Sequence, residues 1–300
     1  MGLLDDKVVV VTGAGRGIGR GEALECARQG AAVVLNEFDP AVGAGVVDEI
    51  KTLGGSAVLV EGDVSDVAVA DSLIATAVGE FGRLDGLVNN AGVLRDRTLA
   101  KMTPEEWDTV IRVHLRGHYA PTHAALVHWR ERGGPGHVVC TASTSGLLGN
   151  FGQSNYGAAK AGIAAFAQIV AQETARMGVT CNAIAPAART RMTEGAYGEI
   201  FGSADDFDFW HPDNVAPLVA FLVSDAAAHI SGKVFGVQGD AVELYQPFTS
   251  VAVIQNHDTR FTAEGIAARA HELFDSSGIN PEVENMMAKL RFTMTDRADL

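Results

Sequence analysis

The strongest constraint in this sequence is a regular alternation of short apolar runs and longer amphipathic stretches through residues 1–240. The apolar runs show little polar alternation, which is typical of strands covered on both faces of a sheet. Parallel strands need long crossover connections, and helices in those connections cover the two faces. The pattern therefore predicts an α/β fold with a doubly wound parallel sheet of about seven strands. The predicted strands are Val8–Val11, Ala32–Asn36, Ala57–Glu61, Gly86–Asn89, His137–Thr141, Val179–Ala183 and Val234–Val237.

The stretches between these runs have the length and the apolar periodicity of helices. The predicted helices are Gly17–Gln29, Ala41–Leu53, Val67–Phe81, Pro104–Arg132, Asn155–Met177 and Asn214–Ser224.

The pattern changes after Gly239. Leu244–Asn256 is expected to be extended, and Thr262–Asp275 and Pro281–Leu290 are expected to be helical, with Thr262 or Asn280 as caps. This tail has too few apolar residues for a core of its own. We therefore predict one domain over residues 1–240 and a C-terminal helical extension over residues 241–300, packed on that domain or across a subunit interface.

Acidic residues outnumber basic residues, because Asp plus Glu is 37, Lys plus Arg is 23, and the net charge is −14. Such a surface repels nucleic acids and anionic membranes. No window reaches the roughly 18 consecutive apolar residues of a membrane-spanning helix. We expect neither a nucleic-acid partner nor a membrane partner.

The three cysteines, Cys26, Cys140 and Cys181, lie far apart in apolar stretches. Their odd number and wide spacing indicate buried thiols in a reducing compartment. No Cys/His cluster has the spacing of metal ligands, so no metal site is predicted. The N-terminus lacks the apolar run of a secretory signal, and we expect a cytoplasmic location.

The first predicted strand continues into Thr12-Gly13-Ala14-Gly15-Arg16-Gly17-Ile18-Gly19, which leads into the first predicted helix. Glycines let the backbone turn tightly and approach a pyrophosphate, and a helix N-terminus attracts that anion. A glycine-rich loop without a ligand is the alternative interpretation. The strand–loop–helix context favours a dinucleotide-binding, Rossmann-like fold.

Glu37 follows the second predicted strand, where a carboxylate can accept hydrogen bonds from both ribose hydroxyls of a dinucleotide. The same carboxylate repels the 2′-phosphate of NADP. Arg16 argues weakly the other way, because its guanidinium could meet that phosphate. We predict NAD as the cofactor, with NADP the less favoured choice and a solvated strand-end charge as the alternative role of Glu37.

Tyr156 and Lys160 lie one helical turn apart near the start of a long predicted helix, so they share one face. Ser143 follows the fifth predicted strand, and ligands of open α/β sheets bind at such strand ends. A nearby ammonium and a positively charged cofactor ring would favour the tyrosine phenolate. The phenolate could take a proton from an alcohol while hydride leaves the same carbon.

Together these motifs resemble the classical short-chain dehydrogenase/reductase family over residues 7–240. They are Thr12-Gly13-x3-Gly17-Ile18-Gly19, Asn89-Asn90-Ala91-Gly92, Ser143 and Tyr156-x3-Lys160. Four further segments, at residues 89–97, 113–117, 149–153 and 185–193, and the tail after residue 240 resemble the (3R)-hydroxyacyl-CoA dehydrogenase units of peroxisomal multifunctional enzymes of type 2, also called 17β-hydroxysteroid dehydrogenase type 4.

The resemblance implies a role for each matching residue. Tyr156 would be the catalytic base, Lys160 would hold the nicotinamide ribose and lower the tyrosine pKa, and Ser143 would orient the substrate. The implied cofactor-binding residues are Gly13, Arg16, Gly17, Ile18, Gly19, Glu37, Asp63, Val64, Asn90, Ala91, Gly92, Tyr156, Lys160, Pro186 and Thr190. Asp63 and Val64 would flank the adenine, and Pro186 to Thr190 would contact the nicotinamide end. Asp63 could instead cap a loop, and Asn90 to Gly92 could simply support the sheet.

Two positions depart from the pattern of the wider family. His114 stands where most members have an asparagine that supports a water chain from the active-site lysine. A proton relay through the imidazole and a packed helix residue are both open for His114. Pro186-Ala187 replaces the Pro-Gly expected after the sixth strand, so the cofactor contacts of this loop are not determined.

The leading hypothesis is an NAD-dependent oxidoreductase that converts a (3R)-hydroxyacyl-CoA, with a fatty or steroid side-chain acyl group, into the 3-oxoacyl thioester. The alternatives are an NADPH-dependent 3-oxoacyl reductase, a hydroxysteroid dehydrogenase and a nucleotide-binding protein without catalysis. The segment from Arg189 to Trp210 would be the substrate lid. The resemblance also implies a homodimer or homotetramer that associates through the two longest predicted helices.

Overall fold

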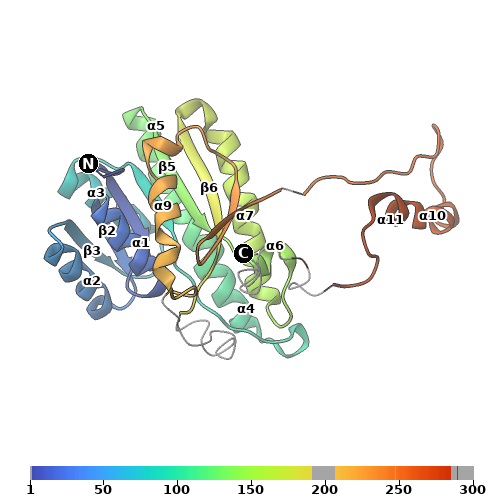
Figure 1. The fold of residues 1–300 in the computed structure, drawn as a ribbon, viewed down its shortest axis with the longest axis horizontal. Coiled ribbons are helices and arrows are strands. Elements are labelled where there is room, and N and C mark those ends of the chain that lie inside the picture. Colours follow the sequence, from blue (N-terminus) through green and yellow to red (C-terminus); the bar gives the residue numbers. More distant parts are fainter. Residues whose placement is uncertain (1, 191–206, 247, 285–288, 290–300) are drawn as a thin grey trace.

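The computed structural model describes residues 2–190, 207–246, 248–284 and 289. Its centre is an 8-stranded sheet in the order β3-β2-β1-β4-β5-β6-β7-β8 (Figure 1). All neighbouring strands are parallel except β7 and β8, which are antiparallel. The strands are β1 Val8–Thr12, β2 Ala32–Glu37, β3 Ser56–Glu61, β4 Gly86–Asn89, β5 Gly136–Thr141, β6 Val179–Ala187, β7 Val234–Gln238 and β8 Ala241–Tyr245. All seven predicted strands are present, which confirms the doubly wound fold.

Helices cover both faces of the sheet. The α-helices of the described residues, including those that do not cover the sheet, are α1 Gly17–Arg28, α2 Pro40–Thr52, α3 Val67–Phe81, α4 Pro104–Ile111, α5 Gly117–Arg132, α6 Thr144–Leu148, α7 Ser154–Thr174, α9 Ala216–Leu222, α10 Ala263–Arg269 and α11 His271–Ser277. None of these helices has the length and apolar character needed to cross a membrane.

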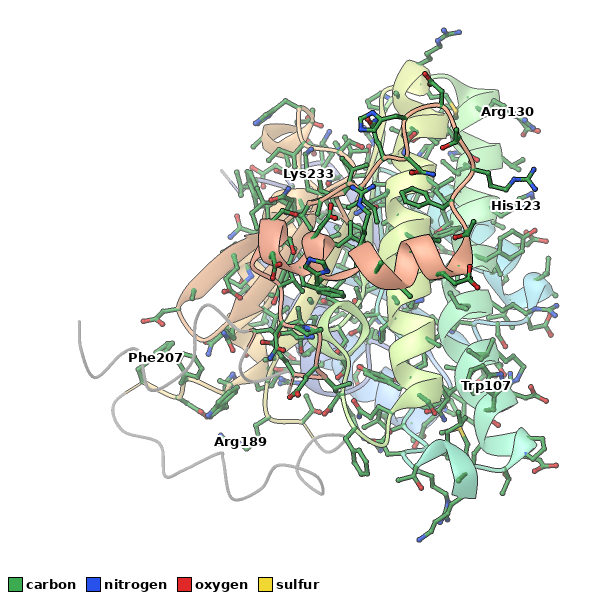
Figure 2. The ribbon with its side chains drawn as sticks, turned by 90° about the vertical axis from the view of Figure 1, so that its right-hand side faces the viewer. Trp107, His123, Arg130, Arg189, Phe207 and Lys233 are labelled. Atoms are coloured by element: carbon green, nitrogen blue, oxygen red, sulfur yellow. The ribbon has the colours of Figure 1, made fainter. Side chains whose placement is uncertain are left out.

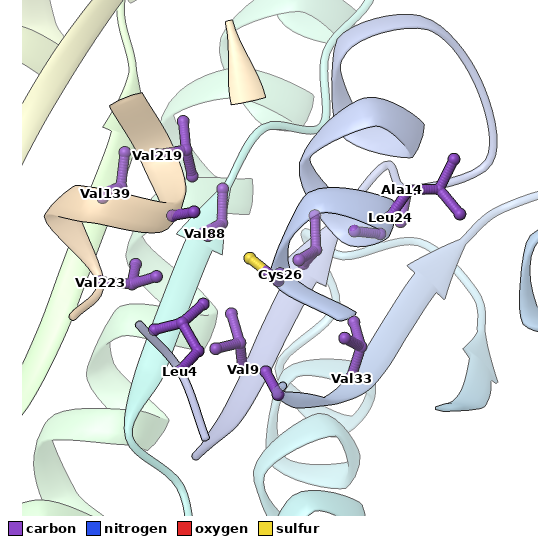
Figure 3. Packing of buried hydrophobic residues seen from close by; sticks show 14 of the residues in the cluster. Leu4, Val9, Ala14, Leu24, Cys26, Val33, Val88, Val139, Val219 and Val223 are labelled. Atoms are coloured by element: carbon purple, nitrogen blue, oxygen red, sulfur yellow. The ribbon is translucent and has the colours of Figure 1, made fainter. Parts of the chain in front are cut away.

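The hydrophobic core has two layers, one on each face of the sheet. One layer contains buried residues of α1, α2 and α9, and the other contains buried residues of α3, α5 and α7. Cys26 on α1 lies in the first layer, where its thiol packs among Val9 of β1, Val88 of β4 and Leu4 (Figure 3). Every residue of β1 is buried, which explains the unbroken run of valines in this strand.

The strand order reverses between β1 and β4, and this reversal positions the site. The chain leaves β1 toward β2 on one side and leaves β4 toward β5 on the other. The connections at the carboxyl ends of these two central strands therefore diverge, and a crevice opens between them. The glycine-rich loop follows β1 and the Asn90–Gly92 turn follows β4, so the fold brings these two motifs together.

The long helix predicted over Pro104–Arg132 is interrupted in the structure. Thr103 begins α4 with a capping box that includes Glu106. A π-helical turn over Arg112–Arg116 then separates α4 from α5. Such wide turns insert an extra residue into a helix and are frequent at functional sites. Periodicity alone did not reveal the interruption, because apolar residues continue through it.

The C-terminal extension differs in detail from its prediction. Its extended segment pairs with the sheet earlier than expected, as strand β8 rather than from Leu244. The helix expected over Thr262–Asp275 is two helices, α10 and α11, which meet at Ala270. Thr262 is the cap as predicted, because its Oγ1 accepts a hydrogen bond from the Gly265 N–H at 3.0 Å.

Helices α10 and α11 stand apart from the sheet and the helices that cover it (Figure 1). Several apolar side chains of the extension are exposed, with Phe248 at 98%. The helix predicted over Pro281–Leu290 is not present in residues 281–284, and most of its remainder lies outside the described residues.

Glu22 on α1 has a fully buried carboxyl group. Neither of its carboxyl oxygens has a hydrogen-bond partner among the described residues. Burial raises the pKa of Glu22 from 4.5 to about 8, although the charge of Lys160 partly opposes this shift. Between these two values the folded protein keeps a proton that the unfolded chain has released. The free energy of unfolding therefore falls as the pH rises through this window.

We predict that Glu22→Gln removes this pH-dependent loss. Relative to the wild type, the free energy of unfolding of the variant should rise by about 1.4 kcal/mol per pH unit between pH 5 and 8. Urea denaturation at pH 6, 7 and 8 measures the difference, and Glu80→Gln at the exposed end of α3 is the control. Replacing the carboxyl group by an amide can also change the free energy of unfolding by an amount that does not depend on pH. Such a change leaves the slope of the free energy against pH as predicted. Equal slopes in wild type and variant would contradict the prediction.

Candidate active site

Ser143, Tyr156 and Lys160 come together around the carboxyl end of β5. The Lys160 ammonium donates a hydrogen bond to the Thr141 carbonyl at the end of this strand. Ser143 lies two residues further along, is 8% exposed, and caps α6 with an Oγ that accepts from the Ser145 N–H at 3.2 Å. Helix α6 packs closely on α7, because a Cβ placed on Gly146 would lie 2.8 Å from Lys160 Cβ. The packing of α6 on α7 therefore keeps the three residues in one place.

Lys160 lies beside Tyr156 in a fully buried position. Its Nζ is 5.6 Å from the centre of the Tyr156 ring. Burial lowers the pKa of Lys160 from 10.5 to about 7, although the charges of Cys140 and Glu22 partly oppose this shift. The charge of the amine is therefore sensitive to its surroundings near neutral pH. This geometry suits a lysine that acts on the phenol electrostatically.

His114, from the π-helical turn, packs edge-on against Tyr156, with ring centres 5.2 Å apart and ring planes at 85°. Its Nε2 is 3.1 Å from the Val93 N and 2.8 Å from the Val93 O. Burial lowers the pKa of His114 to about 3, so the imidazole is neutral. A Cβ on Gly92 would collide with this imidazole, so the turn requires glycine there. His114 is thus a packed residue in contact with Tyr156, and a role as a proton relay remains a prediction.

The glycine-rich loop faces the ends of two other strands. Gly13 and Gly17 have positive φ angles of 62° and 54°. A Cβ on Gly13 would lie 2.7 Å from Ala91 Cα, and a Cβ on Gly17 would lie 3.2 Å from Thr190 Cγ2. Side chains at these glycines would be strained by the positive φ angles and would crowd Ala91 and Thr190, so the loop requires glycine at both positions. Ile18 and Gly19 form the first turn of α1, whose N-terminal N–H groups can bind phosphate.

Asn90 and Ala91 fasten the β4 turn to the end of β1. The Asn90 Nδ2 donates to the carbonyls of Thr12 at 3.0 Å and Gly13 at 3.2 Å. The backbone N–H groups of Asn90 and Ala91 both donate to the Thr12 hydroxyl, at 3.0 and 3.2 Å. The turn supports the central sheet, as the alternative interpretation proposed, and it also forms one wall of the crevice.

Glu37 lies at the carboxyl end of β2, next to the glycine-rich loop. Its Oε2 accepts a hydrogen bond from the Gly15 N–H at 2.9 Å, and its Oε1 accepts from the Phe38 N–H at 3.0 Å. Arg16 is turned toward Asp39, and their charged groups are 3.5 Å apart. The end of β2 therefore carries two carboxylates next to the glycine-rich loop, and the Arg16 guanidinium of that loop is already paired.

Asp63 follows β3, and its side chain is held by the π-helical turn. Its Oδ1 accepts hydrogen bonds from the Ser65 N–H at 2.9 Å and the Ser65 hydroxyl at 2.7 Å, while Arg112 donates to Oδ2. Burial alone would raise the pKa of Asp63, but these hydrogen bonds outweigh it and lower the pKa below its usual value. Its neighbour Val64 is 4% exposed. Arg116 adds a hydrogen bond to the Ser65 carbonyl at 2.9 Å.

The region from Pro186 to Thr190 corrects one expectation. Pro186 was expected to follow the sixth strand, but β6 continues to Ala187 and pairs Pro186 with Val237 of β7. Thr190 reaches the glycine-rich loop, as the contact with Gly17 shows. Residues 191–206 of the predicted lid lie outside the described residues. Figure 2 shows Arg189, which lies shortly before them, and Phe207, which follows them, in the lower half of the view, far from Arg130 at the top.

Sequence reasoning missed the residues that support the site from a distance. Arg112 contacts Asp63 across 49 positions, and Gln153 contacts Asp96 across 57. No local pattern marks these residues, because each has its partner on another element. Asn155, directly before Tyr156, was also missed, because its burial and its partners are seen only in the folded chain.

Comparison with known proteins shows the family to which the chain belongs. Residues 7–197 match the family described as short chain dehydrogenase. The chain is 46% identical over 287 residues to hydroxyacyl-CoA dehydrogenase ChsB1 of Mycobacterium tuberculosis, covering 90% of this chain and 87% of that protein. It is 37% identical over 282 residues to peroxisomal multifunctional enzyme type 2 of Mus musculus, covering 91% of this chain and 37% of the longer protein. The crystal structure of a short chain dehydrogenase from Mycobacterium avium has 41% sequence identity and a TM-score of 0.85, covering 95% of this chain and 99% of that one.

The chain therefore belongs to the short-chain dehydrogenase family. It is an NAD(P)-dependent oxidoreductase that acts on CH–OH groups. Within the family it is similar to the dehydrogenase unit of multifunctional enzyme type 2, which confirms the resemblance seen in the sequence.

We predict that Arg112→Met weakens binding of ADP-ribose, the adenine half of the cofactor. Without the guanidinium, the loop around Asp63 loses one of its fastenings, and a partly exposed ion pair is worth up to about 1 kcal/mol. Calorimetry should show a Kd raised up to about fivefold. Arg269→Met, which removes an ion pair with Glu272 on the extension, is the control. An unchanged Kd for Arg112→Met would contradict the prediction.

Proposed function

We propose that this enzyme transfers hydride between NAD and the secondary alcohol of a (3R)-hydroxyacyl-CoA, giving the 3-oxoacyl thioester. The observation that carries the proposal is the meeting of Ser143, Tyr156 and Lys160 beside the glycine-rich loop. The residues fit a nicotinamide dinucleotide, because the positive-φ glycines leave room for the pyrophosphate and the α1 N-terminus faces it. The nicotinamide ring, when bound, supplies the hydride acceptor.

Three side chains of the site would each have a separate role in the reaction. The Ser143 hydroxyl donates a hydrogen bond to the C3 oxygen of the substrate and fixes its position. The Tyr156 oxygen takes the hydroxyl proton as the C3–H bond breaks, and the product is a C3 carbonyl. The Lys160 amine, in its ammonium form, favours the phenolate over the phenol and also holds the nicotinamide ribose. The fixed place of Lys160 against Thr141 supports this arrangement.

The choice of NAD over NADP rests on the charges at the end of β2. Glu37 and Asp39 would both face a 2′-phosphate, and a carboxylate near a phosphate dianion is strongly unfavourable. Arg16 could have offset them, but it is paired with Asp39. The ribose of NAD has a free 2′-hydroxyl, which can donate to Glu37 instead.

The choice of an acyl-CoA substrate draws support from the relatives. The Mycobacterium tuberculosis protein is named a hydroxyacyl-CoA dehydrogenase, and its similarity extends over 90% of this chain. An absorbance assay at the NADH band separates the candidates when hydroxyacyl-CoA, 3-oxoacyl and hydroxysteroid substrates are each tested with both cofactors. Absence of turnover with all of them would instead favour a nucleotide-binding protein.

We further propose that the enzyme is a homodimer or homotetramer in the cytoplasm. Exposed apolar residues on edge strand β8, Val242 at 59% and Leu244 at 65%, support association. Cys26, Cys140 and Cys181 are free and buried, which supports a reducing compartment. The extension is proposed to begin after residue 240 and to pack on residues 1–240 of the same chain or across a subunit interface. Sedimentation of the purified protein would test the oligomeric state.

We predict that Tyr156→Phe lowers kcat by about 10²-fold or more, because the variant has no group to accept the alcohol proton. NADH binding, measured by fluorescence titration, should stay within about twofold, since the phenyl ring keeps the packing against His114. Turnover close to that of the wild type would remove Tyr156 from the role of base.

We predict that Glu37→Ala lowers the preference for NAD over NADP by about tenfold, equivalent to about 1.4 kcal/mol. The variant loses the acceptor for the ribose hydroxyls and the repulsion of a 2′-phosphate. The matched control is Glu61→Ala, because Glu61 is paired with Glu37 in register on β3. The ratio of kcat/KM values for the two cofactors measures the preference. A wild-type enzyme that already prefers NADPH would show the assignment to be wrong.

A further inference from the structure

Gln153 occupies the N-cap position of α7 but does not cap it with its side chain. It is 6% exposed, and its Nε2 donates to Asp96 Oδ2 at 2.7 Å. Its Oε1 accepts from the Asn150 Nδ2 at 2.9 Å. The side chain at an N-cap position ordinarily accepts a hydrogen bond from a backbone N–H in the first turn of its own helix. Here the amide is directed to the loop that follows β4.

Asn155, two residues after Gln153, also binds this loop. It is fully buried, and its Nδ2 donates to the Arg95 carbonyl at 3.0 Å and the Glu106 carbonyl at 3.3 Å. Its Oδ1 accepts from the Tyr156 N–H at 2.8 Å. The backbone of Tyr156 is thus tied, through one amide group, to the position of Arg95.

The loop is also fastened on its other side. Arg97 forms a β-bridge with Gln153, and its guanidinium donates to Glu106 Oε1 at 2.6 Å. Glu106 in turn belongs to the capping box that begins α4. The loop therefore connects the starts of two helices, α4 and α7.

The loop also reaches the other side of Tyr156. Val93, at its beginning, is the hydrogen-bond partner of His114, and the His114 ring packs against the Tyr156 ring. One short segment, residues 93–97, therefore fixes the backbone of Tyr156 through Asn155 and its ring through His114. A displacement of the segment would change the position of the phenol at both points.

We propose that the Asp96–Gln153 hydrogen bond is a latch that positions Tyr156 for proton transfer. Gln153 and Asp96 act through the loop and are positioning residues, and the proposal rests on the proposed role of Tyr156 as the base. A misplacement of about 1 Å near reacting groups can lower a rate by about 10²-fold. Opening the latch should therefore lower kcat by about 10- to 100-fold and leave cofactor binding within about twofold.

The decisive experiment exchanges the donor and the acceptor. Gln153→Glu places two carboxylates opposite each other, which breaks the latch by repulsion. Adding Asp96→Asn gives the new carboxylate an amide donor, and Asn150 can still donate to it. We expect Gln153→Glu to lose kcat and the double variant to recover to within about threefold of the wild type. The loss in Gln153→Glu should also diminish as the pH falls, because a proton shared between the two carboxyls restores a donor.

Two further variants complete the experiment. Gln153→Leu opens the latch without adding charge, and its loss of kcat should not diminish at low pH. Ser154→Ala, one residue along α7, is the control and should keep the wild-type kcat, because the Ser154 hydroxyl makes a long 3.9 Å contact with the Met102 sulfur and, among the described residues, has no hydrogen bond with the loop. Each variant is measured for kcat, KM and the Kd of NADH in the full-length protein.

The outcomes separate this proposal from the proposed function. A wild type that is active together with unimpaired Gln153 variants would overturn the latch alone. A loss in Gln153→Glu that Asp96→Asn does not rescue, accompanied by an equal loss of NADH binding, would show general structural damage and also overturn it. A wild type without hydride transfer on any tested substrate would overturn the proposed function, and the latch with it.

Discussion

The buried amine of Lys160 is the constraint on which the site depends. It has no access to water, its pKa is lowered by burial, and it is bound to the Thr141 carbonyl at the end of β5. A buried amine needs such a partner, because desolvation without compensation is costly. The bond fixes the start of α7 against the sheet, and Tyr156 lies one turn earlier on the same face. The chemistry therefore follows from the way in which a helix is anchored to a strand.

The layout of the sheet could be predicted because its causes are local. Runs such as the valines of β1 are apolar on both faces, and that pattern requires a strand between two layers of helices. The glycine-rich loop was also predictable, since positive φ angles at Gly13 and Gly17 need residues without a Cβ. The π-helical turn at His114 was not predictable, because it depends on contacts with Val93 and Tyr156 that lie elsewhere in the chain.

The same distinction holds within the site. The proposed catalytic residues could be predicted from short motifs, since Tyr156 and Lys160 are one turn apart and Ser143 follows a strand. The residues that hold them were not found, because Gln153 meets Asp96, and Arg112 meets Asp63, only after the sheet has formed. Support from distant elements leaves little trace in local sequence. The π-helical turn is one such support, since Arg112 contacts Asp63 and His114 packs against Tyr156.

The most direct test of the account is a crystal structure of the enzyme with NAD and a slow hydroxyacyl-CoA substrate or analogue. The account predicts that the Tyr156 hydroxyl lies within about 2.6–3.2 Å of the C3 oxygen, with the nicotinamide ring on the same side of the crevice. A complex in which the C3 oxygen is bound away from Tyr156, or in which the ring lies outside the crevice between β1 and β4, would contradict it.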